Sequence, residues 1–93
     1  MIVSFESKVT KKIWDGERVK DFPAELQEIS RRKLRVLNNS QSLMDLQVPP
    51  SNRLEKMKGN LKAYHSNRIN EQWRVIFKWD GGNALVVEII DYH

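Results

Sequence analysis

The last three residues, Asp91, Tyr92 and His93, each carry a side chain that can move a proton or hold the group that does. They follow directly on Ile89 and Ile90, so we expect a strand to hold them in place, unlike the loose tails that end many chains. The α-carboxylate of His93 is an anion beside its own imidazole, which favours the protonated ring of a general acid. A polar chain end without any chemical role would have the same sequence.

A second candidate, Arg74, lies in the middle of a predicted strand. Alternation along this strand puts four residues on an apolar side, Trp73, Val75, Phe77 and Trp79. We expect that side to form the core, since an aromatic stripe on a small sheet is more often interior than a platform for nucleobases. Arg74 then lies on the opposite side with Ile76 and Lys78, where it could hold an anion or be an ordinary exposed arginine.

Positive charge is concentrated around these candidates. The chain has 16 Lys and Arg against 12 Asp and Glu, a net charge of +4. Seven of the bases lie between residues 53 and 78, with only Glu55 and Glu71 among them: Arg53, Lys56, Lys58, Lys62, Arg68, Arg74 and Lys78. Such a basic stripe attracts nucleic acid, phosphate or an acidic protein, although a solvated face rich in lysine has the same composition.

Several other chemistries have no support in the sequence. The chain contains no Cys, which excludes disulfides, thiolate zinc sites and thiol nucleophiles. Its two histidines, His65 and His93, are not spaced as a metal-binding pair, and its glycines form no phosphate-binding loop. We therefore expect neither a metal nor a cofactor.

The first half of the chain is predicted to be a strand followed by helices. Residues 2–5 include β-branched residues and have apolar residues at both odd and even positions, which is typical of a buried strand. Helical spacing of apolar residues predicts, in order, a two-turn helix capped by Ser7, a longer helix from Pro23 to Leu37 and one more turn at 42–46. Two prolines in 48–52 favour an irregular, extended crossing.

The second half changes to the period of strands. Three β-rich runs, 64–69, 73–79 and 84–90, are separated by sequences that suit hairpin turns. They predict a three-strand antiparallel meander. With the N-terminal strand and two or three helices packed on one face, the fold class is α+β.

Length and hydropathy set the remaining bounds. The 93 residues are expected to form one domain, 1–93. The longest apolar run, 84–87, is far shorter than the ~20 residues that cross a bilayer, and the first residues show no signal-peptide pattern. We therefore expect a cytoplasmic protein.

Taken together, the motifs resemble a known family. They are Arg53-Leu54-Glu55-x-Met57-x-Gly59-Asn60, then Tyr64-His65-Ser66-x-Arg68-x-Asn70-x-Gln72-Trp73-Arg74, and the terminal Glu88-Ile89-Ile90-Asp91-Tyr92-His93. In this combination the chain is similar to the HigB-type branch of the RelE/ParE toxin superfamily. The similarity runs over nearly the whole chain and is dense from residue 49 onward.

The resemblance implies a RelE-like fold and a toxin of a type II toxin–antitoxin system. Such a toxin is a metal-independent endoribonuclease that cuts mRNA on the ribosome and is silenced by a HigA-like helix-turn-helix antitoxin. By motif, the resemblance places Arg74 at the scissile phosphate, Lys58 at a phosphate-contacting position, and Asp91, Tyr92 and His93 in a catalytic cluster. Glu55 stands where some relatives have a histidine.

Cleaving RNA without a metal requires a base for the 2′-hydroxyl, cations for the phosphorane and an acid for the leaving 5′ oxygen. Arg74 and Lys58 are the predicted cations. His93, Glu55 and Asp91 are the candidates for proton transfer, with His93 preferred as acid and Glu55 as base, while Tyr92 would stack on a nucleobase or relay a proton. Further residues of the same stretch are predicted to contact RNA: Arg53, Lys56, Lys62, Arg68 and Gln72.

Two other functions are compatible with these residues. A ParE-like gyrase inhibitor would share the fold, although binding alone does not need a chain end that transfers protons. A non-catalytic basic module that binds nucleic acid or an acidic partner would need only the basic stripe. Induction in cells separates the three, through mRNA decay with translation arrest, a DNA damage response, or neither.

Overall fold

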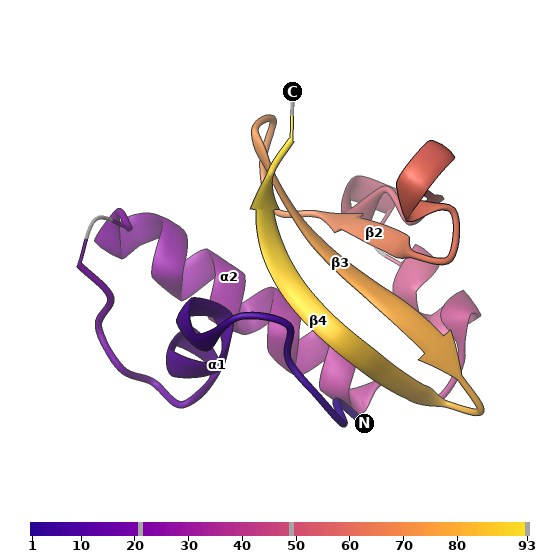
Figure 1. Cartoon of the computed structure of the whole chain (residues 1–93), viewed down its shortest axis with the longest axis horizontal. Coiled ribbons are helices and arrows are strands. Elements are labelled where there is room, and N and C mark those ends of the chain that lie inside the picture. The colour runs from indigo at the N-terminus through magenta and orange to yellow at the C-terminus, as the bar shows by residue number, and fades with distance from the viewer. Residues whose placement is uncertain (21, 49, 93) are drawn as a thin grey trace.

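The computed structural model describes residues 1–20, 22–48 and 50–92, and its centre is a curved antiparallel sheet with helices on one face (Figure 1). The elements are, in order, α1 (Lys8–Trp14), α2 (Ala24–Asn39), the 3-10 helices η1 (Leu43–Gln47) and η2 (Pro50–Asn52), β1 (Glu55–Lys56), η3 (Gly59–Leu61), β2 (His65–Arg68), β3 (Trp73–Asp80) and β4 (Asn83–Asp91). The predicted α+β class is confirmed. The sheet has one strand more than the predicted meander, because β1 is too short to leave a periodic signal.

Both α-helices form where the spacing of apolar residues predicts them. The Oγ of Ser7 caps α1 by accepting a hydrogen bond from the Thr10 N–H at 3.2 Å. Gly16 follows α1 with a φ of 88°, a conformation that glycine adopts without strain. α2 buries three leucines, Leu26, Leu34 and Leu37, and so supplies the apolar face that packs on the sheet.

The stretch 48–52 departs from its prediction. Instead of an extended crossing, residues Pro50–Asn52 form the 3-10 turn η2, and Pro49 lies outside the described residues. Asn52 is 1% exposed; its Nδ2 donates to the carbonyls of Leu46 and Val48, both at 3.3 Å. The prediction was wrong because proline prevents ladder pairing but permits a tight turn. The hydrogen bonds of the buried Asn52 amide to preceding carbonyls stabilise this turn.

The sheet is a meander in the order β1-β2-β3-β4 with every pair antiparallel. β3 and β4 are the longest strands, joined by the turn at Gly81 and Gly82, whose φ values are positive. Between Ile76 and Lys78 the register of the β3–β4 pair shifts, and Val86 on β4 has a φ of 47°. This β-bulge accompanies the strong bend of the two strands seen in Figure 1.

The N-terminal residues run parallel to β4 along its outer edge (Figure 1). Two isolated bridges, Ile2 to Ala84 and Phe5 to Val87, stand where a strand was expected. Between them the Ser4 Oγ accepts a hydrogen bond from the Val86 N–H at 2.9 Å. The bulge at Val86 therefore interrupts the ladder, so this segment pairs with the sheet without forming a regular strand.

The core lies between the sheet and α2. Phe77 is 0% exposed, and Val75 and the three leucines of α2 belong to the same buried cluster. Trp73 and Trp79 pack against this cluster from the same side of β3, so the predicted core side of this strand is confirmed. In the described part of the chain, no helix is both long and apolar enough to cross a membrane.

Candidate functional site

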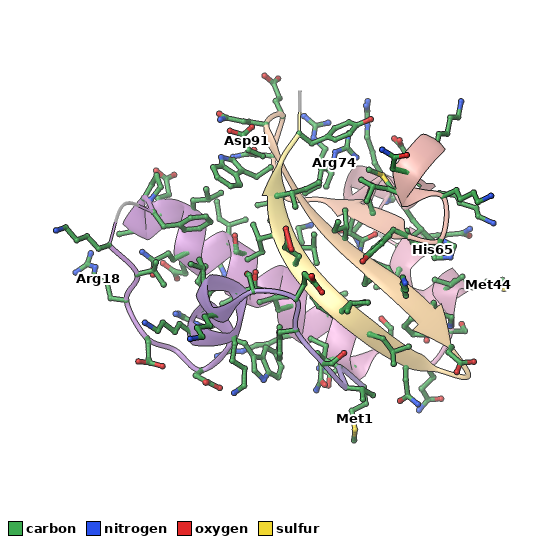
Figure 2. The ribbon with its side chains drawn as sticks, in the orientation of Figure 1. Met1, Arg18, Met44, His65, Arg74 and Asp91 are labelled. Carbon is green, nitrogen blue, oxygen red and sulfur yellow. The ribbon has the colours of Figure 1, made fainter. Side chains whose placement is uncertain are left out.

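Arg74 lies near the start of β3, on the sheet face turned away from α2. Strand alternation puts it opposite in direction to its buried neighbour Val75, which packs in the core. Its neighbours across the ladder are Arg68 on β2 and Ile90 on β4. Figure 2 shows the Arg74 side chain at the end of the sheet near the C-terminus.

The guanidinium of Arg74 is recessed and incompletely bonded. Its side chain is only 13% exposed, and the carboxylate Oε1 of Glu55 lies 3.9 Å from its Nη1. Nε and Nη1 are buried and have no hydrogen-bond partner among the described residues. A buried charge usually has its hydrogen bonds satisfied, so this pair of N–H donors is suited to an incoming anion.

Two other side chains bring positive charge and an aromatic ring to Arg74. Arg68 is its direct cross-strand partner, and two like charges at such positions repel each other unless an anion lies near them. The Tyr92 ring lies 5.4 Å from the guanidinium carbon of Arg74, as a cation–π pair. Tyr92 is 46% exposed, so one side of its ring is open for contact.

The chain end is anchored to the turn that precedes β3. Asp91, the last residue of β4, pairs with Trp73 in the ladder, and its Oδ2 accepts a hydrogen bond from the Gln72 amide at 2.9 Å. The backbone N–H of Tyr92 donates to the Gln72 carbonyl at 2.6 Å. The expectation that a strand holds the residues after Ile90 is therefore confirmed for Asp91. Tyr92 lies just beyond β4 and is held by its hydrogen bond to Gln72, and His93 lies outside the described residues.

The other sequence candidates lie around this group. Glu55 is on β1, one strand beyond β2, and its side chain is 54% exposed. The structure thus brings Arg74, Glu55 and Tyr92 together, and links Asp91 to them through Gln72. The remaining basic candidates have exposed side chains on the β1–β2 side of the sheet or just before it: Arg53, Lys56, Lys58 and Lys62.

Sequence reasoning missed Asn70. Its Oδ1 accepts hydrogen bonds from the N–H groups of Gln72 and Trp73, at 2.9 Å and 2.8 Å. This Asx-type turn sets the conformation of residues 70–72, which connect β2 to β3. An asparagine two residues before a site residue, at a strand connection, is the signal that would have found it.

Two side chains near the sheet have displaced pKa values. Burial, and secondly the charge of Lys56, lowers the pKa of His65 below its ordinary value, and its ring stacks on Phe77 with centroids 5.9 Å apart. Burial, and secondly the negative charge of Glu6, raises the pKa of Glu88. His65 therefore favours its neutral form; it lies on the sheet face that packs on α2, which we call the covered face. Glu88 favours its protonated form and lies on the opposite face of the sheet.

The arrangement is suited to charge stabilisation and proton transfer at a phosphodiester. It combines a recessed cation, a carboxylate within 4 Å of that cation and an aromatic ring against the same cation. Among the described residues, His, Asp and Glu side chains form no group of three that could hold a metal ion. The Arg74 guanidinium can stabilise negative charge and the Glu55 carboxylate can accept a proton, which are the functions of electrostatic and acid–base catalysis.

Comparison with known proteins assigns the family. A family model described as "RelE-like toxin of type II toxin-antitoxin system HigB" matches residues 3–93. The chain belongs to the HigB-like toxins. For this HigB-like toxin, the match covers both the basic stripe and the chain end, and the ParE-like alternative is not favoured.

Individual relatives agree with the family. Toxin HigB-1 of Vibrio cholerae serotype O1 is 38% identical over 86 residues, which cover 91% of this chain and 90% of that protein. Endoribonuclease HigB of Proteus vulgaris is 25% identical over 93 residues, the full length of both proteins. Among solved structures, a chain of the YoeB–YefM complex from Staphylococcus aureus matches with a TM-score of 0.62 at 17% identity, over 100% of this HigB-like toxin and 98% of that chain. The RelE-like fold is confirmed.

Proposed function

We propose that this HigB-like toxin cuts mRNA on the ribosome by a metal-independent attack of the 2′-hydroxyl on the neighbouring phosphate. The chain is a toxin of a type II toxin–antitoxin system with endoribonuclease activity, the activity that its Proteus vulgaris relative carries in its name. The observation that carries the chemistry is the recessed guanidinium of Arg74, with two buried donors and no hydrogen-bond partner among the described residues.

Arg74 is the group that we assign to the scissile phosphate. A phosphorane carries more negative charge than the diester from which it forms, so fixed N–H donors stabilise the transition state more than the substrate. The fork of a guanidinium can reach two of its oxygens at once. Lys58, exposed before η3, is assigned as a second cation for the same charge.

The proton transfers are assigned to Glu55 and His93. The Glu55 carboxylate takes the proton of the 2′-hydroxyl, the 2′ oxygen bonds to phosphorus, and a 2′,3′-cyclic phosphate forms. The bond from phosphorus to the 5′ oxygen breaks, and that oxygen receives a proton from the His93 imidazolium. Asp91 would support the chain end, and Tyr92 would stack on a nucleobase from its exposed side.

The basic residues around the site are assigned to the RNA backbone. Their exposed or half-buried side chains can track phosphates without reading sequence: Arg53, Lys56, Lys62 and Arg68. RNA contact is also predicted from the sequence for Gln72, in the turn before β3, but its side-chain amide donates to Asp91. Contacts with the RNA backbone predict that binding of the message weakens as salt concentration rises.

A HigA-like helix-turn-helix antitoxin is the proposed partner, in the cytoplasm where ribosomes and messages are found. Toxin–antitoxin pairing belongs to the family, and the YoeB–YefM structure holds a toxin and an antitoxin together. The net charge of +4 favours an acidic or mixed partner surface. Co-purification after expression of the toxin together with its neighbouring gene tests this proposal, and recovery of the toxin alone at every ionic strength would contradict it.

Cleavage is tested by adding purified toxin to a reconstituted translation system and mapping the ends of the message. Wild-type toxin should produce cuts with 2′,3′-cyclic phosphate ends, and Glu55→Gln should lose most of this activity, because an amide cannot accept the proton. Glu71→Gln, which changes an exposed carboxylate in the turn before β3, is the matched control and should cut normally. A message that stays intact while the added toxin stops translation would refute the proposal.

A further inference from the structure

The turn between β2 and β3 and the end of β4 are joined by one residue, Gln72. Its side-chain amide donates to Asp91 and its backbone carbonyl accepts from the Tyr92 N–H. The two bonds act on consecutive residues of the chain end. Together they fix both the position and the direction of the backbone where β4 stops.

The turn that carries Gln72 is itself held in place. Asn70 Oδ1 accepts hydrogen bonds from two successive backbone N–H groups, those of Gln72 and Trp73. The Ile69 N–H in turn donates to the Trp73 carbonyl at 2.9 Å, and Trp73 packs edge-on against Phe22 with ring centroids 5.1 Å apart. Gln72 is therefore presented from a rigid base, although its own side chain is exposed.

The residue that Gln72 holds is the one that touches Arg74. The Tyr92 ring forms the cation–π contact with the guanidinium of Arg74, yet Tyr92 lies beyond the last residue of β4. The last pair of the β3–β4 ladder is Trp73 with Asp91. The bond from the Tyr92 N–H to the Gln72 carbonyl continues this pairing by one residue, and the bond from the Gln72 side chain to Asp91 holds the same end from the side.

We infer that Gln72 is a positioning residue, which clamps the chain end so that Tyr92 lies against Arg74 during RNA cleavage. This inference rests on the proposed function and goes beyond it, because it gives Gln72 a role through Asp91 and Tyr92 in place of direct contact with RNA. In this chain it links the Asn-x-Gln-Trp-Arg motif to the Asp-Tyr at the chain end. The first motif supplies Gln72, which forms the clamp, and the cation Arg74. The second supplies the clamped residues, Asp91 and Tyr92.

Three variants separate the clamp from other roles. Gln72→Met keeps the length of the side chain but removes the donor to Asp91. Gln72→Lys restores a donor at that place. Glu71→Gln changes the neighbouring exposed residue of the same turn and serves as the matched control.

The first measurement is hydrogen exchange of the Tyr92 amide, followed by NMR on the free protein. We expect exchange to be roughly three- to tenfold faster in Gln72→Met, since one net hydrogen bond holds the segment less well. Gln72→Lys should bring the rate back to the wild-type value, and Glu71→Gln should not change it. The melting temperature should stay constant in all three, because the changes are on the surface.

The second measurement is the kinetics of message cleavage in the reconstituted translation system. A positioning role predicts that kcat falls by roughly three- to tenfold in Gln72→Met with KM unchanged, and recovers in Gln72→Lys. A rise in KM at constant kcat would overturn the inference, since Gln72 would then only bind RNA. Unchanged Tyr92 exchange in Gln72→Met would overturn it as well.

The two measurements also distinguish this inference from the proposed function. Exchange is measured without RNA or ribosomes, so it tests the hold on the chain end even in a toxin that cuts nothing. A wild-type protein that leaves messages intact would refute the proposed function and the catalytic part of the inference together. The measured hold of Gln72 on Tyr92 would still stand as a structural result.

Discussion

The two faces of β3 have opposite properties although their residues alternate along one strand. On the face toward α2, Val75 and Phe77 are 1% and 0% exposed and belong to the apolar core. On the other face Arg74 is recessed to 13% exposure, with two donors unbonded among the described residues and Arg68 directly beside it. The first face is a mainly apolar interior, in which the buried Oδ1 of Asn67, the cross-strand partner of Val75, has no hydrogen-bond partner among the described residues. The second face leaves a charged group and its hydrogen-bond donors unused.

The contrast indicates where this protein gives up stability for function. Buried, unpaired N–H donors and adjacent like charges both cost free energy of folding. An active site needs such groups in place before the substrate arrives, because reorganising them later would raise the barrier. Substitutions on the two faces should therefore have opposite effects on stability and activity.

The largest effect is expected on the covered face. Phe77→Ala should lower the free energy of unfolding by about 3–5 kcal/mol, because it removes a fully buried ring and leaves a cavity. Denaturant unfolding measures this loss, and cleavage should fall only in proportion to the folded fraction. Folded Phe77→Ala protein of wild-type stability would show that the core does not depend on this face.

Substitution of Arg74 should have the opposite pattern, with a large loss of cleavage and no loss of stability. Arg74→Ala is expected to lower cleavage roughly a hundredfold or more, as removal of a transition-state donor does, while stability stays equal or rises. Arg74→Lys should recover only part of the activity because an ammonium cannot replace the two-pronged fork. Arg32→Ala, on the exposed side of α2, controls for loss of one positive charge. A folded Arg74→Ala variant as active as wild type would make Arg74 an ordinary surface arginine.

A smaller effect is expected from His65 on the covered face. Its pKa is lowered in the folded protein, so the unfolded chain takes up the proton first as pH falls. The contribution of His65 to the free energy of unfolding should therefore be at its maximum above the ordinary pKa near 6.5. It should decrease as pH falls from there to the lowered pKa. In His65→Gln this part of the pH dependence should vanish; a slope identical to that of wild type would assign it to other groups.

The smallest effect is expected from Glu88 on the other face. Its pKa is raised in the folded protein, so its contribution to stability is present at low pH and is lost as pH rises through the raised pKa. Glu88→Gln should thus be slightly more stable than wild type at pH 7 and equal to it near pH 4. Melting curves at the two pH values test this, with Glu6→Gln expected to give part of the same gain.

The sequence predicted the covered face of β3 well because one physical rule governs it. Apolar residues at every second position must face a core in a small sheet, and Phe77 and Val75 follow that rule. The same rule predicted that Arg74 would point away from the helices. Capping chemistry at Ser7 was equally local, and α1 begins where its hydroxyl oxygen can accept from Thr10.

What the sequence did not predict depends on contacts between distant residues. β1 is two residues long and exists only because Glu55 lies opposite Ser66, which no periodicity reveals. The bulge at Val86 places a β-branched residue at positive φ, against its local preference. The clamp from Gln72 to Asp91 spans 19 residues, and its partner could be named only once β3 and β4 were placed in register.

The pairing of the first residues with β4 also has a consequence for how the toxin is made. The N–H groups of Val3 and Glu6 donate to carbonyls of Ala84 and Val87, so residues made early in translation bond with residues made much later. A nascent chain cannot close this edge until residues 84–87 have been translated, and contacts so distant in sequence are slow to form. Products that stop before β4 lack both this closure and the Asp91–Tyr92 end. Closure of this edge of the sheet therefore has to wait for the synthesis of residues 84–87, so a ribosome that stalls before them yields no working copy.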